Sequence, residues 1–173
     1  MNKCVFLDRD GVLNEDRVNY AYQLAHFNIL EGVPKALKML KEAGFLLIVV
    51  TNQSGIAKGI YTRKEVLACY EYLQSQTGNL IDEHYYAPYH PIYSNSLTRK
   101  PDSLMLEKGI AKYHIDTQKS WLVGDSQRDI LAAKKLHIPS IQVGQKEKHC
   151  EEADFSAQDL YEASLHILSL TNN

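Results

Sequence analysis

The chain has 173 residues, of which 45% are apolar and 23% are charged, and its formal net charge is −2. This length fits a single domain over residues 1–173 with a sizeable core. The near-neutral charge gives no support to nucleic acid or an anionic membrane as the main partner. No stretch reaches the roughly 18 or more consecutive apolar residues that a membrane span needs.

The three cysteines, Cys4, Cys69 and Cys150, are odd in number and far apart in the sequence. This spacing predicts free thiols in a reducing compartment, not a disulfide framework or a zinc knuckle. The N-terminus enters an apolar run directly, without the charged and apolar regions of a signal peptide. We therefore expect a cytoplasmic protein. A monomer is the default expectation, because no helix carries a heptad seam.

Apolar runs and helical patterns alternate along the first half of the chain. The pattern predicts, in order, a strand at 4–7, a helix at 33–43, a strand at 45–51, a helix from about 62 to 76 and a weaker strand at 84–88. Pro34 suits a first helical turn, and Gly44 is placed to end the same helix. Thr62 and Glu65 form a predicted capping box. The run 45–51 is unbroken and β-branched, which is typical of a strand covered on both faces.

The second half continues the alternation. It predicts a loop to Pro101, then a helix to about Tyr113, a strand at 120–125, a helix to about Leu136, a strand at 138–144 and a last helix from about Ala157 to Leu170. Strands alternating with helices predict an α/β fold, a Rossmann-like parallel sheet sandwiched by helices. The insertions are short, so no large cap domain is expected. In such sheets the ligand crevice lies beyond the carboxyl ends of the strands.

The first predicted strand ends in two aspartates, Asp8 and Asp10, followed directly by Gly11. Residues i and i+2 of a strand point to the same side, so the two carboxylates would face one another if the strand continued. Such a pair repels unless a cation, a shared proton or hydrogen bonds hold it.

Polar residues also follow the other predicted strands. They are Thr51, Asn52 and Ser54 after the second strand, Arg99 and Lys100 after the third, and Asp125 and Asp129 after the fourth. Carboxylates suit Mg²⁺, and hydroxyl, lysine and arginine groups suit a phosphoryl group. One aspartate after a strand is most often a helix cap, but the joint pattern favours phosphoryl chemistry. Asp129, one turn after Asp125, is either a helix-surface residue or a support for the other site residues.

The same residues resemble the motifs of the haloacid dehalogenase superfamily of phosphatases. "DRDGVLN" at 8–14 is similar to the first signature, Thr51 in "VVTNQSG" to the second, Lys100 in "RKP" to the third and "GDSQRD" at 124–129 to the fourth. "TNQSGIAKG", "YYAPYHP" and "RKP" resemble the capless branch that contains heptose bisphosphate phosphatases and histidinol-phosphatases.

The resemblance implies a role for each matched residue. Asp8 would attack phosphorus to form an aspartyl-phosphate, and Asp10 would act first as general acid and then as general base. Mg²⁺ would be held by Asp8, the backbone carbonyl of Asp10 and Asp125. Thr51 and Lys100 would hold oxygens of the phosphate.

Without a cap, substrate selectivity must come from loops over the strand ends, and the candidates are residues 14–22 and residues 52–59. By the same resemblance, sugar contacts are expected at Asp16, Arg17, Val18 and Asn19, and at Asn52, Gln53 and Ser54. Arg99 would reach a second phosphate that does not react. The alternative for Arg99 is a simple ion pair with a nearby carboxylate.

Two positions depart from the pattern of the branch. Many members hold zinc in the loop before "RKP" through three cysteines and a histidine, whereas loop 85–101 has only His90 and no cysteine. A tetrahedral zinc site needs four ligands, so no zinc is predicted, and His90 is expected to hydrogen-bond within its loop. Ser126 stands where the heptose enzymes tend to have lysine.

The prediction for function is a Mg²⁺-dependent phosphatase that hydrolyses the 7-phosphate of D-glycero-D-manno-heptose 1,7-bisphosphate, in lipopolysaccharide biosynthesis. A histidinol-phosphate phosphatase is the alternative on the same machinery. The alternative of another class is a non-catalytic phosphate-binding module. The presence of Asp8, Asp10, Lys100 and Asp125 together disfavours it. A receiver-type signalling domain shares part of this chemistry but has no use for Asp10 as an acid.

Overall fold

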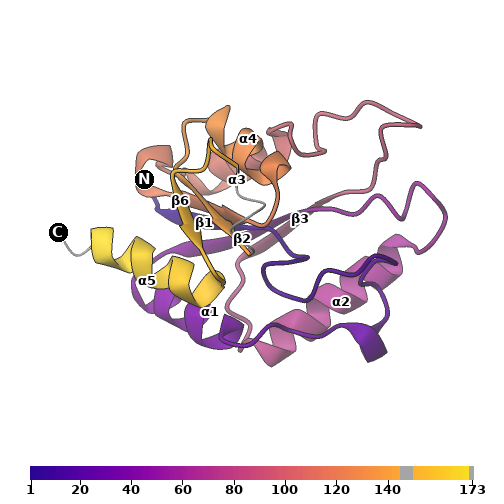
Figure 1. Cartoon of the computed structure of the whole chain (residues 1–173), viewed down its shortest axis with the longest axis horizontal. Helices are drawn as coiled ribbons and strands as arrows, with labels where there is room; N and C mark the ends of the chain where they lie inside the picture. The colour runs from indigo at the N-terminus through magenta and orange to yellow at the C-terminus, as the bar shows by residue number, and fades with distance from the viewer. Residues whose placement is uncertain (145–149, 172–173) are drawn as a thin grey trace.

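The computed structural model describes residues 1–144 and 150–171. Its centre is a parallel sheet with the strand order β3-β2-β1-β4-β5-β6 (Figure 1). The strands are β1 (Cys4–Leu7), β2 (Leu46–Asn52), β3 (Glu83–Ala87), β4 (Trp121–Gly124), β5 (Ser140–Val143) and β6 (Phe155–Ala157).

Helices cover both faces of this sheet (Figure 1). One face packs against α1 (Val33–Glu42), α2 (Arg63–Gln76) and α5 (Leu160–Thr171), and the other against α3 (Leu104–Tyr113) and α4 (Gln127–Lys134). Two 3₁₀ turns, η1 (Leu24–His26) and η2 (Thr117–Lys119), complete the described elements. The predicted α/β sandwich without a large cap is confirmed.

The central strand β1 shows why the sheet needs a helix layer on each side. All four of its residues are fully buried. Val5 and Leu7 join the core beneath α1, α2 and α5, whereas Cys4 and Phe6 join the core beneath α3 and α4. The period-2 alternation of a strand therefore divides one short apolar run between two cores.

The helix ends predicted from the sequence have the expected capping and terminating residues. Thr62 accepts a hydrogen bond from the Lys64 amide, and Glu65 accepts one from the Thr62 amide, so the capping box is formed. Pro34 lies in the first turn of α1. Gly44 follows this helix with a φ of 82°, a left-handed conformation that glycine adopts without strain.

The C-terminal prediction is wrong in one respect. Ala157 does not begin the last helix but ends β6, a strand that the sequence reading lacked, and α5 begins at Leu160. β6 has three residues and pairs in parallel with β5, with Phe155 opposite Ile141. A strand of this length is too short to show a period-2 pattern in the sequence.

Two further features bear on the sequence predictions: the state of the cysteines and the apolar character of the helices. Cys4, Cys69 and Cys150 are free thiols, as expected. Among the described residues, no helix combines the length and apolar character required to cross a bilayer.

The order of the strands fixes where a ligand crevice can form. The chain moves outward from β1 through β2 to β3, then crosses to the other side of β1 to form β4, β5 and β6. The strand order therefore reverses between β1 and β4, and open parallel sheets bind ligands beyond the carboxyl ends of the strands at such a point. Asp8 follows β1 directly and Asp125 follows β4 directly.

Candidate active site

A cleft of about 470 Å³ lies at this edge of the sheet. The five residues predicted for catalysis and metal binding all line it: Asp8, Asp10, Thr51, Lys100 and Asp125. Five of the predicted substrate contacts also line it: Asp16, Arg17, Asn52, Ser54 and Arg99. Segments after four different strands thus meet around one cavity, as the strand-end argument predicts.

Lys100 is the buried cation of the cleft. Its Nζ lies 2.9 Å from Oδ1 of Asp8 and 2.5 Å from Oδ1 of Asp129, and it donates a hydrogen bond of 2.7 Å to the carbonyl of Val50. Burial opposes the charged form of Lys100, but Asp129 and Asp8 outweigh it and raise its pKa. Lys100 therefore stays a cation beside Asp8.

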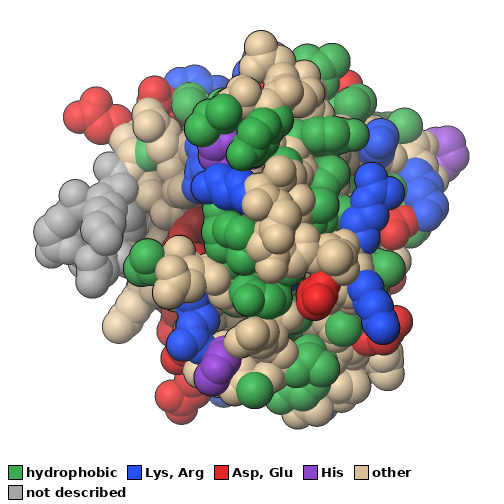
Figure 2. All heavy atoms as spheres, turned by 90° about the vertical axis from the view of Figure 1, so that its right-hand side faces the viewer, with side chains coloured by type: hydrophobic (Ala, Val, Ile, Leu, Met, Phe, Trp, Pro, Cys, Tyr) green, Lys and Arg blue, Asp and Glu red, His purple; other side chains and the backbone are tan. Residues whose placement is uncertain are grey.

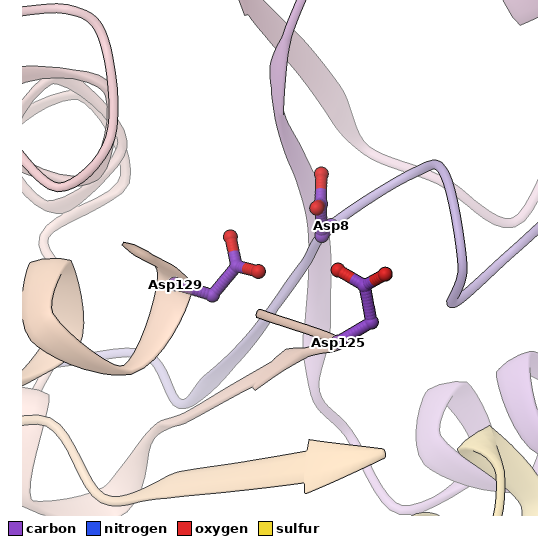
Figure 3. A group of neighbouring side chains, drawn as sticks. All are labelled: Asp8, Asp125 and Asp129. Atoms are coloured by element: carbon purple, nitrogen blue, oxygen red, sulfur yellow. The ribbon is translucent and has the colours of Figure 1, made fainter. Parts of the chain in front are cut away.

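Three carboxylates meet beside Lys100. Those of Asp8, Asp125 and Asp129 lie near one another, and each has an oxygen atom within 4.8 Å of the other two (Figure 3). Burial and then the charge of Asp129 raise the pKa of Asp8 to about 8, although Lys100 opposes this. Burial and Asp129 raise the pKa of Asp125 to about 6. Three ionised carboxylates at this spacing need a further cation.

The three carboxylates differ in how many oxygens are already bonded. Oδ1 of Asp129 pairs with Lys100, and its Oδ2 accepts hydrogen bonds from the amide and the hydroxyl of Ser126. Oδ1 of Asp8 pairs with Lys100 and accepts from the Arg9 amide. Within the described residues, Oδ2 of Asp8 and both carboxylate oxygens of Asp125 accept no hydrogen bond, so these atoms are open to a hard cation.

Asp10 does not face Asp8 in a continued strand, because β1 ends at Leu7 and the chain turns. Its carboxylate instead accepts hydrogen bonds from the guanidinium of Arg9, the amide of Asn14 and the amide of Gln53. Arg9 is itself 2% exposed and donates to the carbonyl of Ala21. Asp10 is therefore fixed at the wall of the cleft.

Gly11 allows this turn and the approach of two segments. Its φ is 80°, and a Cβ atom at this position would lie 2.2 Å from Oδ2 of Asp125. Any side chain at Gly11 would therefore collide with the carboxylate that follows β4.

Buried polar contacts hold Thr51 and the loop after β2. Gln53 is 1% exposed, donates to Oγ1 of Thr51 and to Oδ2 of Asp10, and accepts from the hydroxyl of Tyr61. Asn52 exchanges two hydrogen bonds of 3.0 Å with the backbone of Lys100. Both amides therefore position other site residues.

Three predicted sugar contacts do not line the cleft in this structure. Gln53 lies beneath it, Val18 is fully exposed, and Asn19 lies on the same outer loop as Val18. Arg99 donates to the carbonyl of Tyr89, and no described carboxylate forms an ion pair with it. The ion-pair alternative for Arg99 is thus not seen among the described residues.

The cleft also has six lining residues that the sequence reading did not place among the site residues. They are Tyr20, Lys58, His90, Ser126, Arg128 and Asp129. Helical spacing already placed Asp129 one turn after Asp125, and it could have identified Arg128 in the same way, because residues i+3 and i+4 lie on the same side of a helix. Tyr20 and Lys58 lie within the candidate loops 14–22 and 52–59, although nothing in the sequence singled out these two residues. Tyr20 has a φ of 64°, and Lys58 and Ser54 outweigh burial and lower the pKa of its phenol.

The loop that holds His90 projects from the body of the molecule (Figure 1). His90 accepts a hydrogen bond on Nδ1 from the amide of Ile92, which agrees with the loop role predicted for it. Ile92, Tyr93 and Leu97 are exposed on this loop. Figure 2 shows the corresponding side of the molecule, where hydrophobic side chains lie among lysines and arginines.

Comparison with known proteins supports the reading of the fold and of the class of protein. Residues 97–163 match the family model described as HAD-hydrolase-like. The chain is 40% identical over 145 residues to the D-glycero-beta-D-manno-heptose-1,7-bisphosphate 7-phosphatase of Haemophilus ducreyi, with 79% of each chain covered. It is 32% identical to the D-glycero-D-manno-heptose-1,7-bisphosphate 7-phosphatase of Chlorobaculum tepidum, with 93% of this chain and 92% of that one covered.

A solved structure is similar over nearly the whole chain. The D,D-heptose 1,7-bisphosphate phosphatase of B. bronchiseptica, complexed with magnesium and phosphate, has a TM-score of 0.88 and 27% identity. The match covers 97% of this chain and 99% of that one. The fold, the cleft and these matches define a phosphatase of the haloacid dehalogenase type. Within that class, the chain belongs to the family of D-glycero-D-manno-heptose-1,7-bisphosphate 7-phosphatases.

Proposed function

We propose that the protein is a magnesium-dependent phosphatase that removes the 7-phosphate of D-glycero-D-manno-heptose 1,7-bisphosphate. The observation that carries this proposal is the buried ion pair of Lys100 and Asp8 beside Asp125, in a cleft at the switch point of the sheet. The names of the relatives support the choice of substrate. The proposal includes action as a monomer in the cytoplasm, in lipopolysaccharide synthesis.

The phosphoryl group is transferred first to the protein. One carboxylate oxygen of Asp8 attacks phosphorus while the bond from phosphorus to the sugar oxygen breaks, and the other would be a ligand of the cation. Lys100 and the hydroxyl of Thr51 bind phosphate oxygens, because both line the cleft beside Asp8. Phosphoryl transfer depends mainly on positioning and on stabilisation of charge, which these groups supply.

Asp10 is the general acid of the first step and the general base of the second. Asp10 has to carry a proton when the substrate binds; it gives this proton to the departing sugar oxygen and regains one from the water that attacks the aspartyl-phosphate. That attack releases inorganic phosphate and restores the carboxylate of Asp8. The side chains of Arg9, Asn14 and Gln53 hold Asp10 in one orientation for the two transfers.

Magnesium fits the donor set on this edge of the sheet. Asp8 and Asp125 have carboxylate oxygens open to a cation, and the backbone carbonyl of Asp10 accepts no hydrogen bond in the described residues. All of these donors are oxygen atoms, which Mg²⁺ prefers. When bound, the ion neutralises charge on the phosphoryl oxygens. We propose no zinc in loop 85–101.

A panel of phosphomonoesters tests the proposal. Phosphate release is measured for both anomers of the heptose 1,7-bisphosphate, for histidinol phosphate and for simple sugar phosphates, with Mg²⁺ or with a chelator. We expect the highest kcat/KM for a heptose bisphosphate and loss of activity with the chelator. A clear preference for histidinol phosphate would contradict the substrate, and a chain inert on every ester would contradict catalysis.

A further inference from the structure

Arg128 is an exposed arginine in the first turn of α4, and it lines the cleft on the side of β4. Arg99 lines the same cleft from the loop after β3. In residues 1–144 and 150–171, the guanidinium of Arg128 makes no hydrogen bond or ion pair. The mechanism described above gives it no role.

The position of Arg128 is unfavourable for a cation. The N-terminus of a helix carries partial positive charge and favours acidic side chains. Arg99 adds a second positive charge nearby: burial and then repulsion by Arg128 lower the pKa of Arg99. Arg128 is attracted by the carboxylate of Asp125, but that carboxylate also lies beside Asp8 and Asp129. An anion bound between the two guanidinium groups would relieve their repulsion.

The reacting phosphate does not explain why two arginines, Arg99 and Arg128, line this cleft. Lys100 and Thr51 already lie beside Asp8, where the reacting phosphate would bind. The substrate of the proposed function carries a second phosphate at its other end. Guanidinium groups bind phosphate through paired, directed hydrogen bonds, so two of them lining one cleft suit a doubly charged group.

We propose that Arg128, together with Arg99, binds the phosphate that is not hydrolysed and so selects bisphosphates over monophosphates. This inference rests on the proposed function. It assigns to α4, the helix that follows the predicted metal ligand Asp125, a part in substrate selection. It also gives a reason for an unpaired arginine at a helix N-terminus.

The test compares Arg128→Ala with wild type on two substrates, heptose 1,7-bisphosphate and heptose 7-phosphate, in the presence of Mg²⁺. We expect the ratio of kcat/KM for the bisphosphate to kcat/KM for the monophosphate to fall about 10- to 100-fold, the effect of losing charge-assisted hydrogen bonds. Heptose 1-phosphate, as a competitive inhibitor, should bind more weakly by a similar factor. Arg128→Lys should keep only part of the preference, because an ammonium group lacks the paired donors.

Arg63→Ala is the matched control, because Arg63 is also an exposed arginine in the first turn of a helix but does not line the cleft. It should keep the substrate ratio of wild type. An unchanged ratio in Arg128→Ala, or an equal loss on both substrates, would overturn the role of Arg128. Wild type that does not hydrolyse the bisphosphate at all would instead overturn the proposed function.

Discussion

Nζ of Lys100 lies 2.5 Å from Oδ1 of Asp129, and both side chains are at most 2% exposed. Asp129 also accepts hydrogen bonds from the amide and hydroxyl of Ser126, at the start of α4. It therefore connects the first turn of this helix to the cation beside Asp8. The structure makes Asp129 a buried support for Lys100, not a residue of the helix surface.

Replacement of Asp129 should strongly destabilise the protein. Asp129→Asn leaves the buried ammonium of Lys100 with one carboxylate instead of two, and removal of one partner of a buried ion pair typically costs about 3–5 kcal/mol. We expect a decrease of this size in the free energy of unfolding, measured by urea denaturation. The activity of the folded fraction should also decrease, because Lys100 loses one of the groups that hold it.

Asp102→Asn is the control for this variant. Asp102 pairs with Lys135 at 2.6 Å, but both side chains are nearly half exposed. Exposed pairs contribute about 0–1 kcal/mol, so this substitution should have little effect on unfolding. If both variants lose the same stability, Asp129 has no special role.

The free energy of unfolding should depend on pH because the carboxylates of the cleft are crowded together. The pKa of Asp8 is raised from 3.8 to about 8 in the folded chain, so the folded state keeps a proton that the unfolded state has lost. This contribution is complete below about pH 4 and is lost as the pH rises through 8. With a chelator present, unfolding by urea should therefore become easier as the pH rises from about 6 to about 8.

Two comparisons isolate this effect. The free energy of unfolding of Asp8→Asn should lose most of its dependence on pH. Other titrating groups contribute equally to wild type and to this variant; one of them is His84, whose pKa is lowered to about 4 by burial. Magnesium should reduce the dependence in wild type, because it favours the ionised carboxylates. A wild-type stability that rises over this pH range relative to Asp8→Asn would contradict the crowding.

Gln53 should affect turnover more than substrate binding. Gln53→Ala removes the hydrogen bonds to Asp10 and Thr51 from a position beneath the cleft. We expect kcat to fall by about 10-fold or more while KM changes little, since a buried unpaired group costs about 1–3 kcal/mol. Tyr61→Phe removes the hydroxyl that Gln53 accepts from, and should have a smaller effect. A change confined to KM would show that Gln53 contacts the substrate directly.

Much of the fold could be predicted because its signals are local. The capping box at Thr62 and the unbroken run of β2 depend on neighbouring residues. β6 could not be predicted, because three residues show no periodicity and this strand forms through its pairing with β5. The extent of a single domain over residues 1–173 stays a prediction.

The site could be predicted where residues follow a strand directly, as Asp8 and Asp125 do. Residues that reach the cleft through the path of a loop could not be placed in this way. Tyr20 lines the cleft and Val18 does not, although both belong to the loop after β1. The long-range hydrogen bonds of Gln53 and the position of Arg128 at the cleft likewise depend on the folded chain.

The measurement that tests the central claim most directly is the capture of the phosphorylated protein. Wild type, Asp8→Asn and Asp10→Asn are mixed with an aryl phosphate, whose leaving group needs no acid, then quenched in acid and analysed by peptide mass spectrometry. We predict one phosphoryl group on Asp8 in wild type, more of it in Asp10→Asn because hydrolysis is slowed, and none in Asp8→Asn. Turnover by Asp8→Asn at the wild-type rate, or a phosphoryl group on a different residue, would contradict the account.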